Sequence, residues 1–115
     1  MTPSDLAKIA KPWIEVLGLC GWNIEWRYGG CGRDAAARSN IEPGLCRAII
    51  RVYEDWDEGR DNVLYNTLEC LILHELAHCV LQSADDLVLQ DCPKFTEQLC
   101  WMIARMLLEA RGTNS

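Results

Sequence analysis

The stretch that decides the fold runs from Leu68 to Leu81 and reads LECLILHELAHCVL. Apart from two cysteines, its only ionisable side chains are Glu69 and the three residues His74, Glu75 and His78. A helix with this pattern is apolar nearly all round, so we expect it in the protein interior. Burying two histidines and a glutamate there without partners would be costly. A metal ion and its water would remove that penalty.

The spacing of the two histidines favours a shared metal ion. His74 and His78 are four positions apart, so both imidazoles project from one face of a helix and can bind the same tetrahedral zinc ion. Glu75 is rotated by about 100° from His74 around the helix axis. It can therefore reach a water on the metal without being a ligand, as a general base does. The alternative is a chance match to the short HExxH motif, and the apolar setting argues against it.

The third ligand must be an acidic residue or a cysteine, because a catalytic zinc normally has three protein ligands and the chain has only two histidines. We expect Glu97, which lies at the edge of the apolar face of the last predicted helix and there needs a partner. The alternative is that Glu97 complements the positive end of that helix from the surface. The fallback ligands are Asp85, Asp86 and Asp91, followed by Cys79 and Cys92.

A first helix is predicted near the N-terminus. Thr2 can be its N-cap, with Pro3 and Asp5 in its first turn, and apolar residues at helical spacing continue to Leu17. Pro12 is expected to kink or split the helix, and Gly18 to end it.

Three strands are expected next. Residues 22–28 alternate between apolar and polar side chains, as in a half-buried strand. Residues 34–41 form a weaker candidate because Ala and Arg are poor strand formers, and residues 45–53 form a third strand with Ala48, Ile50 and Val52 on one face. Turns are expected at Gly29-Gly30 and at Pro43-Gly44. In the acidic loop that follows, Trp56 either binds a ligand or caps the core.

The two remaining helices complete the order. The helix with the HExxH motif is expected from Asp61 or Asn62 to about Gln82, and the last helix from Pro93 to about Ala110. The order helix, three strands, two helices is that of an α+β protein. At 115 residues, we expect a single domain covering residues 1–115.

Composition excludes several classes of protein. The net charge of −6 argues against a nucleic-acid partner, and no apolar run is long enough to span a membrane. The N-terminal residues MTPSD lack the features of a secretory signal, so we predict a cytoplasmic protein. The seven cysteines include no CxxC pair, which excludes a zinc ribbon and favours reduced, mostly buried thiols.

The segments LILHELAHCVL and FTEQLCWMIARMLLEA together resemble the gluzincin pattern, in which HExxH supplies two zinc ligands and a downstream helix supplies a glutamate. The element order at this length is similar to minimal gluzincins, or minigluzincins, and to small metallopeptidase-like proteins of phages and prophages. The resemblance spans nearly the whole chain, but the N-terminal half matches only in element order. It implies a zincin-like fold: an N-terminal helix, a three-stranded, mostly antiparallel sheet on the HExxH helix, and a C-terminal glutamate helix. An edge strand could then pair with an extended peptide.

The chain departs from the larger gluzincins at two places. These often carry an acidic residue four positions after the ligand glutamate, where this chain has Trp101. The partner that orients a zinc histidine must then be Glu69, Asp85, Asp86 or a backbone carbonyl. Larger members also stabilise the oxyanion with a Tyr or His from a C-terminal lobe. The tyrosines available here are Tyr28, Tyr53 and Tyr65.

We therefore predict a zinc metallopeptidase that acts on a peptide or protein substrate. Zinc held by His74, His78 and Glu97 would activate a water, with Glu75 as general base. One alternative is a zinc-binding interaction module that cuts nothing. The other is a latent peptidase whose N-terminal helix, hinged at Pro12, covers the site. Ordinary packing of that helix in the core is the competing expectation.

Overall fold

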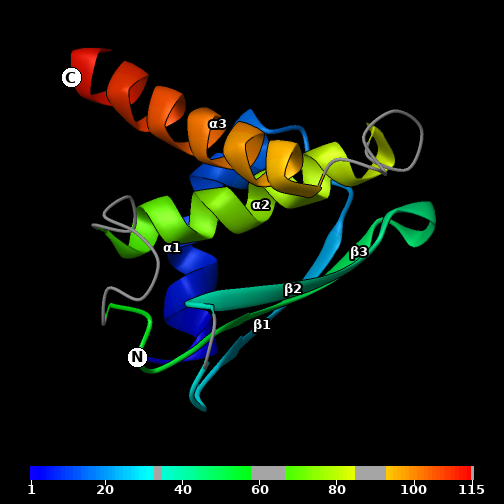
Figure 1. Ribbon diagram of the computed structural model, residues 1–115, viewed down its shortest axis with the longest axis vertical. Coiled ribbons are helices and arrows are strands. Elements are labelled where there is room, and N and C mark those ends of the chain that lie inside the picture. Colours follow the sequence, from blue (N-terminus) through cyan, green and yellow to red (C-terminus); the bar gives the residue numbers. More distant parts are fainter. Residues whose placement is uncertain (33–34, 58–66, 85–92, 115) are drawn as a thin grey trace.

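The computed structural model of the protein describes residues 1–32, 35–57, 67–84 and 93–114. Its elements are α1 (Pro3–Val16), β1 (Asn23–Tyr28), β2 (Ala37–Glu42), the 3-10 helix η1 (Pro43–Leu45), β3 (Arg47–Val52), α2 (Leu68–Ala84) and α3 (Pro93–Asn114). One helix thus precedes a three-stranded sheet and two helices follow it (Figure 1). The predicted α+β class and element order are confirmed.

The first helix begins where its capping residues predict. The Thr2 hydroxyl accepts a hydrogen bond from the Asp5 backbone N–H, and the Asp5 carboxylate accepts one from the Thr2 N–H, which makes a capping box. The helix is continuous through the exposed Pro12, so the predicted split does not occur. It ends at Val16, and Gly18 adopts the left-handed conformation just beyond the C-cap, with φ of 72°.

The sheet is mixed, with strand order β1-β3-β2. β2 pairs antiparallel with β3, as expected, through the tight η1 turn, in which Cys46 has φ of 48°. β1 instead pairs parallel with β3. This follows from the path of the chain. After β1 the chain crosses to the far edge of the sheet and forms β2, and β3 then runs back between the two strands, antiparallel to β2 and parallel to β1. Both β1 and β2 are therefore edge strands among the described residues.

Alternation separates the two faces of the sheet. The inward side chains of β3 are Ala48, Ile50 and Val52, which are buried as predicted. The strand predicted at residues 45–53 is shorter than expected because Pro43–Leu45 forms η1. On the other face the side chains are mostly polar and exposed.

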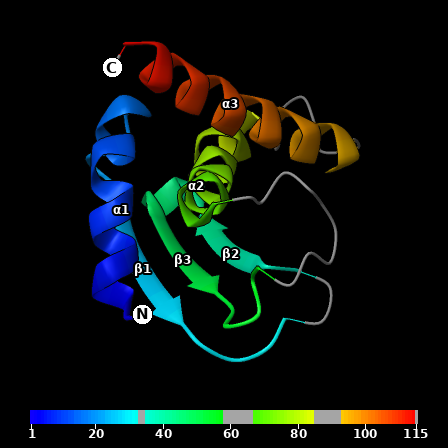
Figure 2. The same cartoon turned by 90° about the vertical axis from the view of Figure 1, so that its left-hand side faces the viewer.

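α2 is the centre of the molecule. Figures 1 and 2 show it between the sheet and α3, with α1 alongside β1. Every residue from Cys70 to Ala77 is buried, as expected for an all-round apolar helix. The predicted helix starts at Asp61 and Asn62 lie outside the described residues. α3 continues to Asn114, past the end expected near Ala110.

The described cysteines are free thiols, and only half of them are buried. Cys70, Cys79 and Cys100 are buried, whereas Cys20, Cys31 and Cys46 are exposed, so the expectation of mostly buried thiols is only partly met. None of the described helices combines the length and the apolar character needed to cross a membrane.

Candidate metal centre

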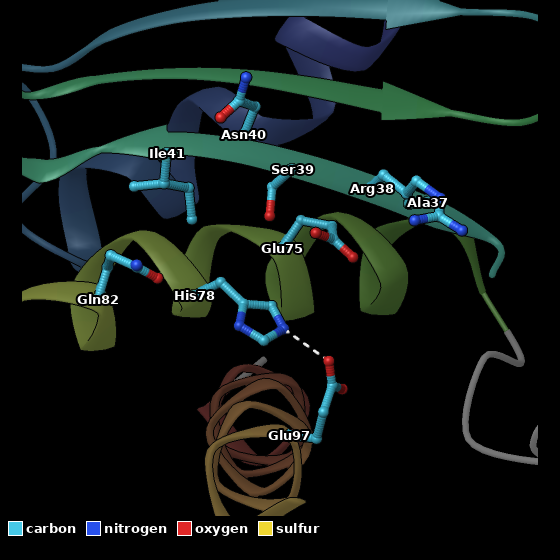
Figure 3. Close-up of a pocket in the computed structure, with 9 residues that line it drawn as sticks. All are labelled: Ala37, Arg38, Ser39, Asn40, Ile41, Glu75, His78, Gln82 and Glu97. Carbon is cyan, nitrogen blue, oxygen red and sulfur yellow. Dashed lines mark hydrogen bonds and ion pairs between the residues drawn. The ribbon is translucent and has the colours of Figure 1, made fainter. Parts of the chain in front are cut away.

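Three side chains from two helices meet at one point. Glu97 of α3 places Oε2 2.9 Å from His74 Nε2 and Oε1 3.0 Å from His78 Nε2. The two Nε2 atoms of α2 are 3.2 Å apart. Ligand atoms around a tetrahedral zinc ion are about 3.3 Å apart, given metal–ligand distances of about 2.0–2.1 Å. The group can therefore hold a metal ion, and the three predicted ligands are brought together. Figure 3 shows two of them, His78 and Glu97, facing each other.

The helices fix the two imidazoles in different surroundings. His74 is 1% exposed, and its ring lies against the Trp101 ring with centroids 4.0 Å apart. His78, one turn later, is at the edge of a cavity with its side chain 17% exposed. Trp101, four positions after Glu97 on α3, thus supports the ring of His74 by aromatic packing.

The electrostatics of the group favour a cation. Hydrogen bonds to His74 and His78 hold the pKa of Glu97 far below its usual range. Burial alone would lower the pKa of His78, but hydrogen bonds with Cys100 and Glu97 outweigh burial and raise it to about 10. Both shifts stabilise a positive charge between the two helices. A divalent metal ion supplies that charge when it displaces the proton.

Glu75 lies in the same cavity without belonging to the ligand group. It is 5% exposed, and burial raises its pKa despite the opposing effects of the two histidines and a hydrogen bond with Ser39. Figure 3 shows Ser39 directed from β2 towards Glu75. A carboxylate that is more basic than an ordinary glutamate is suited to accept a proton near neutral pH.

The cavity beside the metal group has a volume of about 540 Å³. It lies between β2 on one side and α2 and α3 on the other (Figure 3). The described residues that line it are Ala37, Arg38, Ser39, Asn40, Ile41, Glu75, His78, Gln82 and Glu97. None of them belongs to α1, which instead buries Leu6, Ala10 and Trp13 in the core. The competing expectation, that this helix packs in the core, is therefore met, and no described residue of α1 covers the cavity.

Glu69, one of the four candidates for orienting a zinc histidine, is bonded elsewhere. Glu69 is five positions before His74 on α2 and so points about 140° away around the helix. It accepts hydrogen bonds from Trp13 Nε1, at 2.7 Å, and from Arg111 Nη2, at 2.6 Å.

The other candidates lie elsewhere or outside the described residues. Cys79 is buried in the core and is not in the metal group. Tyr28 and Tyr53 do not line the cavity, and Trp56 packs against the core, the second of its two expected roles. The remaining candidates are outside the described residues: Tyr65, Asp85, Asp86, Asp91 and Cys92.

Sequence reasoning missed three neighbours of the predicted group. Ser39 is the polar residue at an inward position of β2, between Ala37 and Ile41, and the alternation of that strand could have identified it. Cys100 follows Glu97 by three positions, a spacing that puts both on one helix face. The position of Arg38 at the cavity could not be predicted from its local sequence, because it depends on how β2 pairs with β3.

Comparison with models of protein families, with curated proteins and with solved structures finds no match to this chain. The resemblance to gluzincins therefore rests on the HExxH segment and on the compatible geometry of the His74, His78 and Glu97 group.

Proposed function

We propose that the protein is a gluzincin-type zinc metallopeptidase. The single observation that carries this proposal is the convergence of two imidazoles and one carboxylate beside a cavity that a separate, buried glutamate also lines. Two histidines and a glutamate are one of the ligand sets of catalytic zinc. A purely structural site would have no use for the additional acid of Glu75.

In this mechanism His74, His78 and Glu97 would hold the metal. Bound there, a zinc ion would lower the pKa of a water and polarise a substrate carbonyl. Glu75 would accept a proton from the attacking water as the water oxygen bonds to the carbonyl carbon. Glu75 would then return the proton to the amide nitrogen as the C–N bond breaks. Ser39 and Trp101 hold Glu75 and the His74 ring in position.

The open edge of β2 gives an extended peptide a place to bind. The Tyr53 N–H donates to the Ala36 carbonyl at 3.1 Å, just beyond the paired strands β2 and β3. This bond identifies which residues of β2 form backbone hydrogen bonds with β3. Because bonded pairs alternate in antiparallel sheets, Arg38 and Asn40 bond to β3, whereas Ser39 and Ile41 direct their N–H and C=O groups towards the open edge. These groups lie along the cavity and can pair with a substrate strand.

The proposal is tested by Glu75→Gln. This variant should lose roughly 10²–10⁴-fold in turnover of a fluorescence-quenched peptide library and keep one zinc per chain by elemental analysis, because Glu75 is a base and not a ligand. Glu15→Gln, on the exposed side of α1, is the matched control and should keep full activity. Equal activity of wild type and Glu75→Gln would contradict the mechanism.

A zinc-stapled interaction module without catalysis is the second candidate. It is favoured by the position of the metal group, which links α2 to α3, and by the absence of a tyrosine among the described residues of the cavity. Removing the metal with a chelator distinguishes the peptidase from the interaction module. A peptidase scaffold should keep its helical circular dichroism after 1,10-phenanthroline treatment, since α2 and α3 also share a buried core, whereas a stapled module should unfold.

A further inference from the structure

The outward face of the sheet carries an unusual charge distribution. Nine side chains point outward from the three strands, and four of them are arginines while two are glutamates. The chain as a whole has 17 acidic residues and 11 lysines and arginines. This face is therefore locally basic on an acidic protein.

Three of these arginines form a single row across the sheet. Arg51 of β3 is in register with Arg27 of β1 on one side and with Arg38 of β2 on the other. Neighbouring strands are about 4.8 Å apart, and like charges directly opposite each other are destabilising. The row thus has a cost for the fold that no packing requirement explains, since Arg27 and Arg38 are exposed.

The three arginines of the row differ in whether they have a hydrogen-bond or ion-pair partner. Arg27 pairs with Glu25 at 2.6 Å, and Arg51 Nη1 donates to the Gly29 carbonyl at 3.4 Å. Arg38 has no hydrogen bond or ion pair within the part of the chain that the structure describes. Its guanidinium group is therefore the member of the row that is available to a ligand.

Arg38 also belongs to the metal cavity and to the open edge of the sheet. A peptide strand added to β2 would place alternate side chains on the outward face, and one of them would lie beside Arg38 as the fourth member of the row. The side chains on the other face would point towards α2, as Ser39 does in Figure 3.

We propose that Arg38, supported by Arg51 and Arg27, binds an acidic side chain of the extended peptide that lies along β2. This rests on the proposed function, because it assigns the substrate class of the same site. A planar guanidinium group binds a carboxylate through two parallel hydrogen bonds. A peptide carboxylate fits better than a nucleic-acid backbone, since a run of phosphates needs a run of cations, whereas Arg38 is followed on the outward face of β2 by Asn40 and Glu42.

The test measures binding of fluorescein-labelled octapeptides to the zinc-loaded, full-length Glu75→Gln protein. The probes are (Thr-Glu)4, (Thr-Gln)4 and (Thr-Lys)4, in which every second residue is on one face of an extended strand. We expect (Thr-Glu)4 to bind roughly three- to tenfold more tightly than (Thr-Gln)4, as for an exposed charge pair with good geometry, and (Thr-Lys)4 to bind most weakly.

Substitutions locate the effect. Arg38→Gln should remove the preference for glutamate over glutamine, and Arg38→Glu should favour (Thr-Lys)4. Arg47→Gln is the matched control, because Arg47 is on the same face but pairs with Glu42 outside the row. It should leave the preference unchanged.

A preference that survives in Arg38→Gln, or is lost equally in Arg47→Gln, would overturn the inference. So would tighter, Arg38-dependent binding of a 12-nucleotide oligothymidylate. Failure of the proposed function looks different. If wild type cleaves no peptide but the Arg38-dependent preference persists, the inference holds and catalysis is wrong. If wild type cleaves peptides without regard to glutamate content, catalysis holds and the inference is wrong.

Discussion

Helices α2 and α3 are joined by a glutamate at two places, and the two places differ in what neutralises that glutamate. In the clamp, formed by Glu69, Arg111 and Trp13, the Arg111 guanidinium group bonds both carboxylate oxygens of Glu69 and lies 5.1 Å from the Trp13 ring centroid. In the metal centre, the ion pairs of Glu97 within the described ranges are those with His74 and His78. The two places are about 21 Å apart along α3.

The difference lies in whether the positive charge is permanent. The hydrogen bond from Arg111 lowers the pKa of Glu69, and the hydrogen bond to Glu69 raises that of Arg111, so the clamp is complete within the chain. The imidazoles of the metal centre are positive only when protonated, and a metal ion can replace the proton. The clamp thus stabilises the fold with a fixed charge, whereas the group of His74, His78 and Glu97 can take up a metal ion in place of a proton.

The largest difference between the metal centre and the clamp should be in how a substitution of their glutamate changes the affinity for zinc. Glu97→Gln keeps the size of the side chain but removes its negative charge and one ligand oxygen, so the zinc dissociation constant should rise at least about a hundredfold. The matched substitution Glu69→Gln should change it less than about threefold. Competition titrations with a fluorescent zinc chelator measure both, and equal losses would remove the distinction between the two places.

A smaller effect is expected from pH. Because the pKa of His78 is raised from 6.5 to about 10, zinc must displace a proton, and its affinity should increase about tenfold per pH unit between these values. The metal-free protein should show the opposite trend. A raised folded-state pKa contributes stability that is fully present below pH 6.5 and is lost as pH rises towards 10. Thermal melts and zinc titrations from pH 6 to pH 9 measure both trends, and parallel trends would contradict this assignment.

The smallest effect should come from the clamp itself. Glu69→Gln removes a partly exposed ion pair and weakens the hydrogen bond from Trp13, so the Tm should fall by about 3–6 °C at neutral pH. The Tm difference should shrink in high salt, because exposed charges are screened. Scanning calorimetry on the metal-free protein checks this, with Glu15→Gln as the surface control. An unchanged Tm would show that packing alone joins the helices here.

Local patterns predicted the helices and the grouping of His74, His78 and Glu97 well. The all-round apolar sequence of α2 indicated burial, and two histidines on one face of a buried helix indicated a metal. Glu97 followed from the ligand count and from its place on the last helix. The capping box at Thr2 and the burial of α2 could be predicted because they depend on residues close in sequence, whereas Glu97, 19 positions after His78, followed from the scarcity of histidines in the chain.

Features that depend on distant pairing could not be predicted. The clamp joins residues 42 positions apart, and the row of Arg27, Arg51 and Arg38 exists only because of the mixed strand order. The parallel pairing of β1 follows from the path of the chain and not from any strand's own sequence. The packing of Trp101 against His74 could not be predicted either, because it depends on how α3 lies against α2.

The most direct test of the proposed zinc site is a crystal structure of the zinc-loaded protein with anomalous data collected at the zinc edge. The proposal predicts one strong peak, about 2.0–2.2 Å from His74 Nε2, His78 Nε2 and a Glu97 oxygen, with a fourth position open towards Glu75. A peak coordinated by cysteines, or one whose four positions are all filled by protein side chains, would contradict it.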